Sequence, residues 1–222
     1  MRWGKSVALL LGCALLMWLR AGHGADTPGL KDLTAPDQQA AQHILVLGDS
    51  LSAEYGLPRG TGWVTHIERR LATRDQAYQI RNASISGDTT IGGLQRLPQL
   101  LKEFGPDLVI IQLGANDGLR GLPVSEMQGS LGKMIELSRA EGAEVLLVGQ
   151  HVPPNYGPRY AREFHDAYGA LANEMGVALV PFMLEGIATD AEMFLPDGLH
   201  PTEAAQAHIA DTIWPYLEPL LK

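Results

Sequence analysis

Two kinds of hydrophobic pattern follow one another along this chain. From residue 43 onward, short runs of aliphatic and β-branched residues alternate with longer stretches in which apolar residues recur every three or four positions. The short runs predict strands and the longer stretches predict amphipathic helices. Alternation of the two is typical of βαβ units around a parallel sheet. We expect strands at 43–47, 78–82, 108–113, 145–148 and 178–181, and helices near 62–74, 92–104, 124–141, 161–175 and 202–221.

The most apolar of these runs indicates how the layers are arranged. Residues 108–113 read LVIIQL, so nearly every position is apolar, which is typical of a strand that is buried on both faces. A three-layer α/β/α sandwich is therefore expected. Glycine and proline mark several helix ends: Gly105 and Pro106 end the second helix, and Gly142 and Gly176 occupy C-cap positions. Pro201 is expected in the first turn of the last helix.

The N-terminus has the features of a signal peptide over residues 1–25. Arg2 and Lys5 precede an apolar run at 7–19, which is followed by small residues near Ala25. The run is too short for a membrane-spanning helix, which needs about 20 apolar residues. An alternative is lipoprotein processing at LLGC, which would leave a lipidated Cys13. That cut would leave half of the apolar run on the mature chain, so an exported protein, periplasmic or secreted, is the favoured interpretation.

The remaining chain divides into a linker and one domain. Residues 26–42 are polar, contain two prolines and show no periodicity, which predicts a linker. Residues 43–222 then form a single domain, whose length is ordinary for one hydrophobic core.

Charge and cysteine content exclude several classes of partner. Removal of residues 1–25 takes away the single cysteine and three of the 17 basic residues, leaving 14 basic and 25 acidic residues and a net charge of −11. No disulfide and no cysteine nucleophile is then expected. An acidic surface also argues against nucleic acid, and against an anionic membrane as the main partner, so no stable membrane insertion is expected after signal cleavage.

Polar segments follow the predicted strands, where ligands bind in sheets of this type. The carboxyl ends of parallel strands meet at one edge, and the crevice lies where the strand order reverses. The segments that leave the strands are 48–52, 83–88, 114–118, 151–155 and 196–201.

Two of these segments contain the parts of a nucleophilic site. Ser50 directly follows the first strand, and Asp197 and His200 lie three residues apart before the last helix. A serine hydroxyl becomes a nucleophile only beside a general base, which an acid orients. Ser50 alone can equally be a helix N-cap, and the Asp197 and His200 pair alone can be a metal pair or a structural histidine.

The glycine- and asparagine-bearing segments can supply oxyanion donors. Gly87 offers a backbone N–H and Asn116 offers a side-chain amide, and each such donor typically lowers a barrier by about 3–4 kcal/mol. Taken singly, both are also ordinary turn residues. Their occurrence together with Ser50, Asp197 and His200 favours a hydrolytic site.

The four segments together resemble the sequence blocks of the GDSL, or SGNH, hydrolases. The blocks are GDSLS at 48–52, Gly87, GAND at 114–117 and DGLH at 197–200. Longer runs, NASISGDTT at 82–90, NDGLRG at 116–121 and PNYGPRY at 154–160, are similar to the bacterial periplasmic thioesterase I, lysophospholipase and arylesterase subgroup. Ala115 departs from the family pattern, in which glycine is common.

The resemblance implies a fold and a role for each residue. The fold is a flavodoxin-like sheet of five parallel strands in the order 2-1-3-4-5. Ser50 is the nucleophile, His200 the general base and then acid, and Asp197 the group that orients His200. The oxyanion hole consists of the backbone N–H groups of Ser50 and Gly87 and the Asn116 side chain, with no metal and no cofactor.

Acyl substrates need an apolar groove beside Ser50. The loop residues expected to bind the acyl group are Leu119, Leu122, Val152, Tyr156, Phe194 and Leu195. His151 also follows a strand, but it has no acid nearby in sequence, so it is expected to shape the cleft rather than act as the base.

The favoured function is hydrolysis of small-molecule acyl esters and thioesters through an acyl-enzyme on Ser50. A carbohydrate O-deacetylase of the same family is an alternative with the same chemistry. A flavodoxin-like binding module without turnover is an alternative from another class, and a metal-dependent phosphoesterase using Asp49, Asp197 and His200 is a third. The sequence leaves the physiological acyl group and the oligomeric state open.

Overall fold

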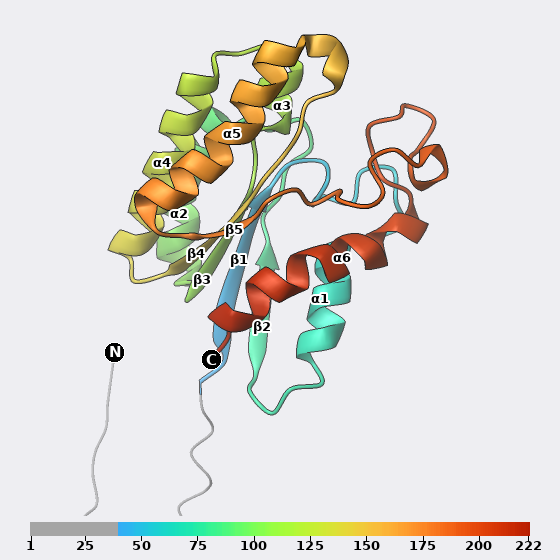
Figure 1. Ribbon diagram of the computed structural model, residues 1–222. Helices are drawn as coiled ribbons and strands as arrows, with labels where there is room; N and C mark the ends of the chain where they lie inside the picture. Colours follow the sequence, from blue (N-terminus) through green and yellow to red (C-terminus); the bar gives the residue numbers. More distant parts are fainter. Residues whose placement is uncertain (1–39) are drawn as a thin grey trace, which may run out of the picture. The chain divides into compact units, whose positions relative to one another are not determined.

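The structure, a computed structural model, describes residues 40–222. Five strands form one parallel sheet in the order β2-β1-β3-β4-β5 (Figure 1). The strands are β1 (Gln42–Gly48), β2 (Tyr78–Asn82), β3 (Leu108–Gln112), β4 (Glu144–Val148) and β5 (Ala178–Val180). The expected fold class and the strand order implied by the family resemblance are both confirmed.

Helices cover both faces of the sheet, as Figure 1 shows. The α-helices of the described residues are α1 (Trp63–Leu71), α2 (Thr90–Phe104), α3 (Ala115–Leu119), α4 (Val124–Ala140), α5 (Pro158–Met175) and α6 (Glu203–Leu217). Short 3₁₀ helices are η1 (Pro154–Tyr156), η2 (Ala191–Met193) and η3 (Glu218–Leu220). Helices α2, α4 and α5 pack on one face, and α1 and α6 pack on the other.

The buried strands supply both hydrophobic cores because successive side chains point to opposite faces. In β1, Leu45 and Leu47 belong to the core under α2, α4 and α5, whereas Ile44 and Val46 belong to the core under α1 and α6. All four side chains are 0% exposed. The near-continuous apolar runs seen in the sequence are therefore explained by burial on both sides of the sheet.

Some elements begin at other residues than expected, or were not expected at all. Pro201 lies outside α6, so its expected place in the first helical turn is wrong. It forms an isolated antiparallel bridge with Phe194, which keeps the backbone extended until Thr202, the N-cap of α6. Helix α3 was not expected, since its sequence ANDGL reads as a turn. Gly105 and Gly176 end α2 and α5 in the left-handed conformation, as expected.

The expected signal peptide at 1–25 and residues 26–39 of the expected linker lie outside the described residues. Strand β1 begins at Gln42, one residue earlier than expected, and Gln42 pairs with Tyr78. Across residues 40–222, no helix is both long enough and apolar enough to cross a membrane.

Candidate active site

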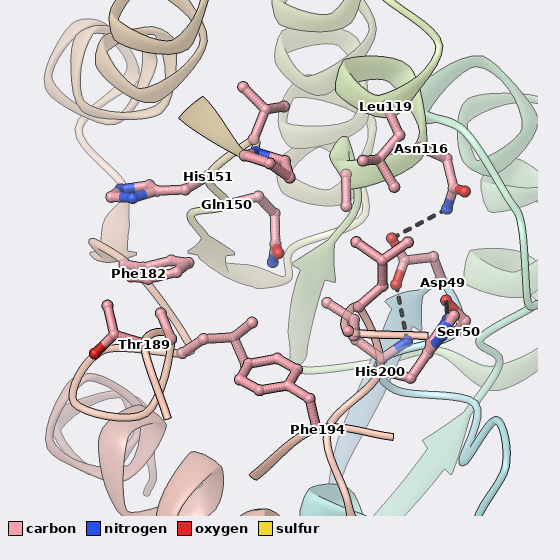
Figure 2. Close-up of a pocket in the computed structure, with 18 residues that line it drawn as sticks. Asp49, Ser50, Asn116, Leu119, Gln150, His151, Phe182, Thr189, Phe194 and His200 are labelled. Atoms are coloured by element: carbon pink, nitrogen blue, oxygen red, sulfur yellow. Dashed lines mark hydrogen bonds between the residues drawn. The ribbon is translucent and has the colours of Figure 1, made fainter. Parts of the chain in front are cut away.

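Ser50 and a pair of side chains about 150 residues later in the sequence form one hydrogen-bonded chain at the carboxyl edge of the sheet. Ser50 follows β1, the strand at which the order reverses, and Asp197 and His200 lie in the segment that precedes α6. His200 Nε2 lies 2.9 Å from Ser50 Oγ, and His200 Nδ1 lies 2.8 Å from Asp197 Oδ2. Figure 2 shows His200 and Ser50 side by side. The structure thus brings together the residues predicted as the triad, in hydrogen-bonding geometry.

The Asp197 carboxylate is fixed by its own turn. Its Oδ1 accepts hydrogen bonds from the backbone N–H of Leu199 at 2.9 Å and of His200 at 3.0 Å. These backbone bonds, His200 first and Leu199 second, together with the bond from the His200 ring, lower the pKa of Asp197 to about 2. Asp197 is therefore ionised at neutral pH, and it holds the proton of the His200 ring on Nδ1, leaving Nε2 to face the Ser50 hydroxyl.

The turn that presents Ser50 depends on a close approach at Gly48. A Cβ atom there would lie 2.7 Å from Gln112 Oε1 and 2.8 Å from the Ser52 side chain, so only glycine fits. Ser52 Oγ donates to Gln112 Oε1 at 2.5 Å and accepts from the Trp63 indole N–H at 3.2 Å. These bonds join the ends of β1 and β3 to α1 and fix the backbone from which Ser50 projects.

Asp49 lies beneath this turn and is 0% exposed. Its Oδ1 accepts from Leu51 N and from Gln112 Nε2, both at 3.0 Å. Its Oδ2 lies 3.4 Å from Asn116 Nδ2, a bond that Figure 2 also shows. Burial is the main cause that raises the pKa of Asp49 to about 6, against the opposing effect of the Leu51 and Gln112 hydrogen bonds. Asp49 therefore links the Ser50 turn to the Asn116 amide.

The predicted oxyanion donors lie on three segments. Within residues 40–222, the backbone N–H groups of Ser50 and Gly87 have no hydrogen-bond acceptor. Gly87 has φ +78°, which suits glycine, and its carbonyl accepts from Arg120 Nη2 at 2.9 Å. Both N–H groups are therefore available to a ligand, and Arg120 ties the Gly87 turn to the end of α3.

Arg96 fixes the same turn from the other side. Its Nε donates to Asp88 Oδ2 at 2.8 Å, and its guanidinium also contacts the carbonyl oxygens of Ala83 and, at 3.4 Å, Gly48. The pair is partly buried, which makes it less screened than a surface pair. Arg96 thus holds the end of β1 and the Gly87 turn together.

A largely apolar cavity of about 530 Å³ extends from Ser50 and His200 (Figure 2). Of the residues predicted to bind the acyl group, Leu119, Val152 and Phe194 line it, whereas Leu122, Tyr156 and Leu195 do not. Leu195 lines a neighbouring hollow instead, and the Tyr156 hydroxyl donates to the Leu119 carbonyl at 2.8 Å. His151 lines the cavity, in agreement with its expected place in the cleft. Further lining residues include Gln150, Phe182, Leu184, Ala188 and Thr189.

Sequence reasoning missed several of these residues for different reasons. Gln112 had a visible signal, since it is a polar residue inside an apolar strand. Phe182, Leu184 and Thr189 carry no such signal, because they belong to a long irregular segment that crosses the sheet edge between β5 and η2. Across the described range, no three histidine, cysteine, aspartate or glutamate side chains are grouped so that they can hold a metal ion.

Comparison with known proteins agrees with this geometry. Residues 46–208 match the GDSL-like Lipase/Acylhydrolase family. The chain is 52% identical to Esterase TesA of Pseudomonas aeruginosa over 83% of its own length and 92% of that protein. The crystal structure of TesA superposes with a TM-score of 0.79 over 81% of this chain and 100% of that one.

Two further relatives have related names. The chain is 49% identical to Arylesterase of Vibrio mimicus over 79% of its length and 88% of that protein. It is 40% identical to Thioesterase 1/protease 1/lysophospholipase L1 of Escherichia coli K12 over 82% and 86%, respectively. The strand order, the serine, histidine and aspartate contacts and these matches lead to one conclusion: the chain belongs to the GDSL-like lipase/acylhydrolase family.

Proposed function

We propose that this acylhydrolase cleaves acyl esters and thioesters by transferring the acyl group to Ser50. The observation that carries the proposal is the continuous hydrogen-bonded chain from Ser50 Oγ through His200 to Asp197. Relatives named esterase, arylesterase and thioesterase, at 40–52% identity, support the same substrate class.

The reaction proceeds in two acyl-transfer steps. Ser50 Oγ attacks the carbonyl carbon while His200 Nε2 takes its proton, and the oxyanion receives hydrogen bonds from the N–H groups of Ser50 and Gly87 and from Asn116. His200 then protonates the leaving alcohol or thiol, which leaves an acyl-enzyme. In the second step His200 removes a proton from water, the hydroxide attacks the ester carbonyl, and the carboxylic acid and the Ser50 hydroxyl are released.

The cavity favours an acyl group longer than acetyl. Apolar side chains such as Leu119, Val152 and Phe194 line the space next to Ser50, and burial of each methylene contributes about 0.8 kcal/mol. A carbohydrate O-deacetylase would make no use of this space. Rates for acetyl and octanoyl p-nitrophenyl esters separate the two functions, because an O-deacetylase would favour acetyl.

A fluorophosphonate probe tests the nucleophile directly. The probe should label the wild-type protein at Ser50, and Ser50→Ala should abolish both labelling and ester hydrolysis while leaving the circular dichroism spectrum unchanged. Turnover that survives in Ser50→Ala would contradict the assignment. A wild-type protein without a probe adduct or turnover would instead be a binding module.

We also propose that the protein is exported. The support is the signal-like sequence at residues 1–25, with the polar residues 26–41 between it and β1 as the linker to the catalytic domain. Expression of the full chain in a bacterial host, followed by N-terminal sequencing of the periplasmic fraction, tests this. A mature N-terminus near residue 26 is expected, whereas a lipidated Cys13 would indicate the lipoprotein alternative.

A further inference from the structure

Gln150 is a buried polar side chain in the wall of the apolar cavity. It follows β4, is 2% exposed and lines the same cavity as Ser50. Its neighbours in the cavity wall include Val152, Phe182 and Leu184. A carboxamide in such surroundings is costly unless its polar atoms are hydrogen-bonded.

Within the described part of the protein, the Gln150 carboxamide makes only one weak hydrogen bond. Gln150 Nε2 lies 3.1 Å from the thioether Sδ of Met183, and a thioether is a weak acceptor. Within residues 40–222 the carboxamide oxygen of Gln150 receives no hydrogen bond from the protein, and it is not among the fully buried atoms without a partner, so it is open to the cavity. In contrast, the buried Gln112 uses both polar atoms: Oε1 accepts from Ser52 Oγ and Asp49 N, and Nε2 donates to Asp49.

The buried Gln206 is satisfied in the same way as Gln112. Its Oε1 accepts from Trp63 N at 3.0 Å, and its Nε2 donates to the Thr202 carbonyl at 3.2 Å. Two buried glutamines, Gln112 and Gln206, are thus paired at both polar atoms. Gln42 leaves its Nε2 without a partner but does not line the cavity, so what distinguishes Gln150 is that its incompletely paired carboxamide faces the cavity. Figure 2 shows it pointing into the space between Phe182 and the Ser50 and His200 pair.

The sheet register relates the two strands, β1 and β4, after which Ser50 and Gln150 lie. Gly48 in β1 pairs with Gln112 in β3, and the residue before it, Ile111, pairs with Leu147 in β4, so Gly48 and Val148 lie at the same level of the sheet. Ser50 follows Gly48 by two residues, and Gln150 follows Val148 by two residues. Their strands are separated by two strand spacings, about 10 Å. An acetyl group on Ser50 is too short to reach Gln150, whereas a medium-length acyl chain reaches it.

We infer that Gln150 is a specificity-determining residue that selects acyl groups carrying a hydroxyl or carbonyl oxygen part way along the chain. The inference rests on the proposed acyl-transfer function and names its substrate class. A carboxamide both donates and accepts, so it pairs with either kind of oxygen. A plain alkyl chain would cover Gln150 and leave it unpaired, and sites built to bind a polar group discriminate strongly against analogues that lack it.

Other polar groups occupy the same end of the cavity. His151 and Thr189 line it with Gln150, on the side away from Ser50 in Figure 2. The His151 ring stacks on Phe182 with centroids 3.9 Å apart and planes 4° apart, which holds both rings as one wall. The largely apolar cavity therefore has three polar side chains, Gln150, His151 and Thr189, at the end away from Ser50, where they can meet an oxygen part way along an acyl chain.

The test is a positional scan with p-nitrophenyl esters. Decanoate, the positional isomers of hydroxydecanoate with the hydroxyl on one of carbons 6 to 10, and acetate are compared by kcat/KM. In the wild-type enzyme, one or two adjacent hydroxyl positions should exceed the other isomers by about tenfold. The isosteric variant Gln150→Met should lose this peak and gain activity on decanoate. A flat wild-type profile, or a peak that persists in Gln150→Met, overturns the inference.

Two controls separate the possible failures. Leu184→Met changes the same cavity without removing a polar group, so it should keep the peak. If Gln150→Met does not fold, Gln150→Leu takes its place. The positional profile of the wild-type enzyme tests the inference without any variant. Hydrolysis of acetate, which does not reach Gln150, reports on Ser50 alone. Acetate turnover with a flat profile refutes only the role of Gln150, whereas a wild type inactive on all esters refutes the proposed function.

Discussion

The Asp117 carboxyl group accepts two hydrogen bonds from Thr90, one from its backbone N–H at 2.9 Å and one from its hydroxyl at 2.6 Å. Asp117 is 4% exposed and Thr90 is 1% exposed. Asp117 directly follows Asn116, and Thr90 begins α2, three residues after Gly87. This pair therefore joins the two segments that carry the predicted Gly87 and Asn116 oxyanion donors.

Thr90→Val tests whether the pair positions Asn116. The variant loses the 2.6 Å bond and leaves a buried carboxyl group without one partner, so the free energy of unfolding should fall by about 1–3 kcal/mol. We expect kcat to fall about tenfold, with little change in KM, because a displaced donor acts mainly in the transition state. Steady-state kinetics and urea denaturation measure both effects.

A double-mutant comparison shows whether Thr90 acts through Asn116. In an Asn116→Ala background, Thr90→Val should have little further effect on kcat, since the donor it positions is already gone. Additive losses would mean that Thr90 has only a structural role. Thr73→Val is the matched control, because that hydroxyl donates to the Arg70 carbonyl on the exposed surface. It should change neither kcat nor stability appreciably.

Asp49 makes the stability of the protein depend on pH. Its pKa is raised from 3.8 to about 6 by burial, so the folded protein binds the proton more tightly than the unfolded chain does. The Asp49 contribution to the free energy of unfolding is therefore present below pH 4 and is lost as the pH rises to about 6, with a slope of at most about 1.4 kcal/mol per pH unit. Asp49→Asn should lack this slope in urea denaturation at pH 4 to 7.

Asp107 offers a control of opposite sign. The backbone N–H of His43 is the main cause that lowers the pKa of Asp107, so its contribution to stability is present above pH 4 and is lost at lower pH. Asp107→Asn should therefore lower the free energy of unfolding above pH 4 and weaken its loss on acidification, without changing the slope between pH 4 and 6. An Asp49→Asn profile parallel to the wild type between pH 4 and 6 would contradict the assignment for Asp49.

Asp197→Asn tests the orientation of His200. The substituted amide can still accept the Leu199 and His200 backbone bonds, but its NH₂ group would favour the tautomer in which Nδ1 lacks the proton. We expect kcat to fall by about 10³- to 10⁴-fold, as for other catalytic triads, with KM nearly unchanged. A fall of less than tenfold would show that Asp197 does not set the tautomer.

The acid side of the wild-type rate profile should not report Asp197. Its pKa of about 2 keeps the carboxylate ionised at every pH at which the enzyme is assayed. In a plot of kcat/KM against pH, Asp197→Asn should therefore lower kcat/KM at all pH values. The fall of kcat/KM at acidic pH that the wild type shows should remain in the variant.

The sequence predicted the sheet well because its central strands, β1, β3 and β4, are buried on both faces. Val109 and Ile111 pack under α2, α4 and α5, and Leu108 and Ile110 pack under α1 and α6, so both sets must be apolar. Short polar elements were harder to predict. Helix α3 consists of ANDGL, whose residues favour turns, and it forms a helix in a tertiary setting where Asp117 pairs with Thr90.

The residues of the candidate site also fall into a group that short sequence motifs predict and a group that they do not. Ser50, Asn116 and His200 follow from short motifs, because hydrogen-bonding chemistry restricts which residue types can serve. The cavity wall does not follow from motifs: Phe182 and Thr189 reach it through an irregular segment, and nothing in their local sequence indicates that fold. Gln150 was missed because a glutamine after a strand is usually exposed, and only the sheet register brings it level with Ser50.

Gln206 connects the His200 segment to α1 and provides a test of stability alone. Its Oε1 accepts from the buried N–H of Trp63, an N-terminal group of α1 that has no acceptor within its own helix. Gln206→Met keeps the side-chain length but leaves that N–H unpaired, so Tm should fall by about 3–10 °C. Gln95→Met, on the exposed side of α2, should leave Tm within about 2 °C of the wild type. Equal Tm values for the two variants would show that the Trp63 N–H finds another partner, such as water.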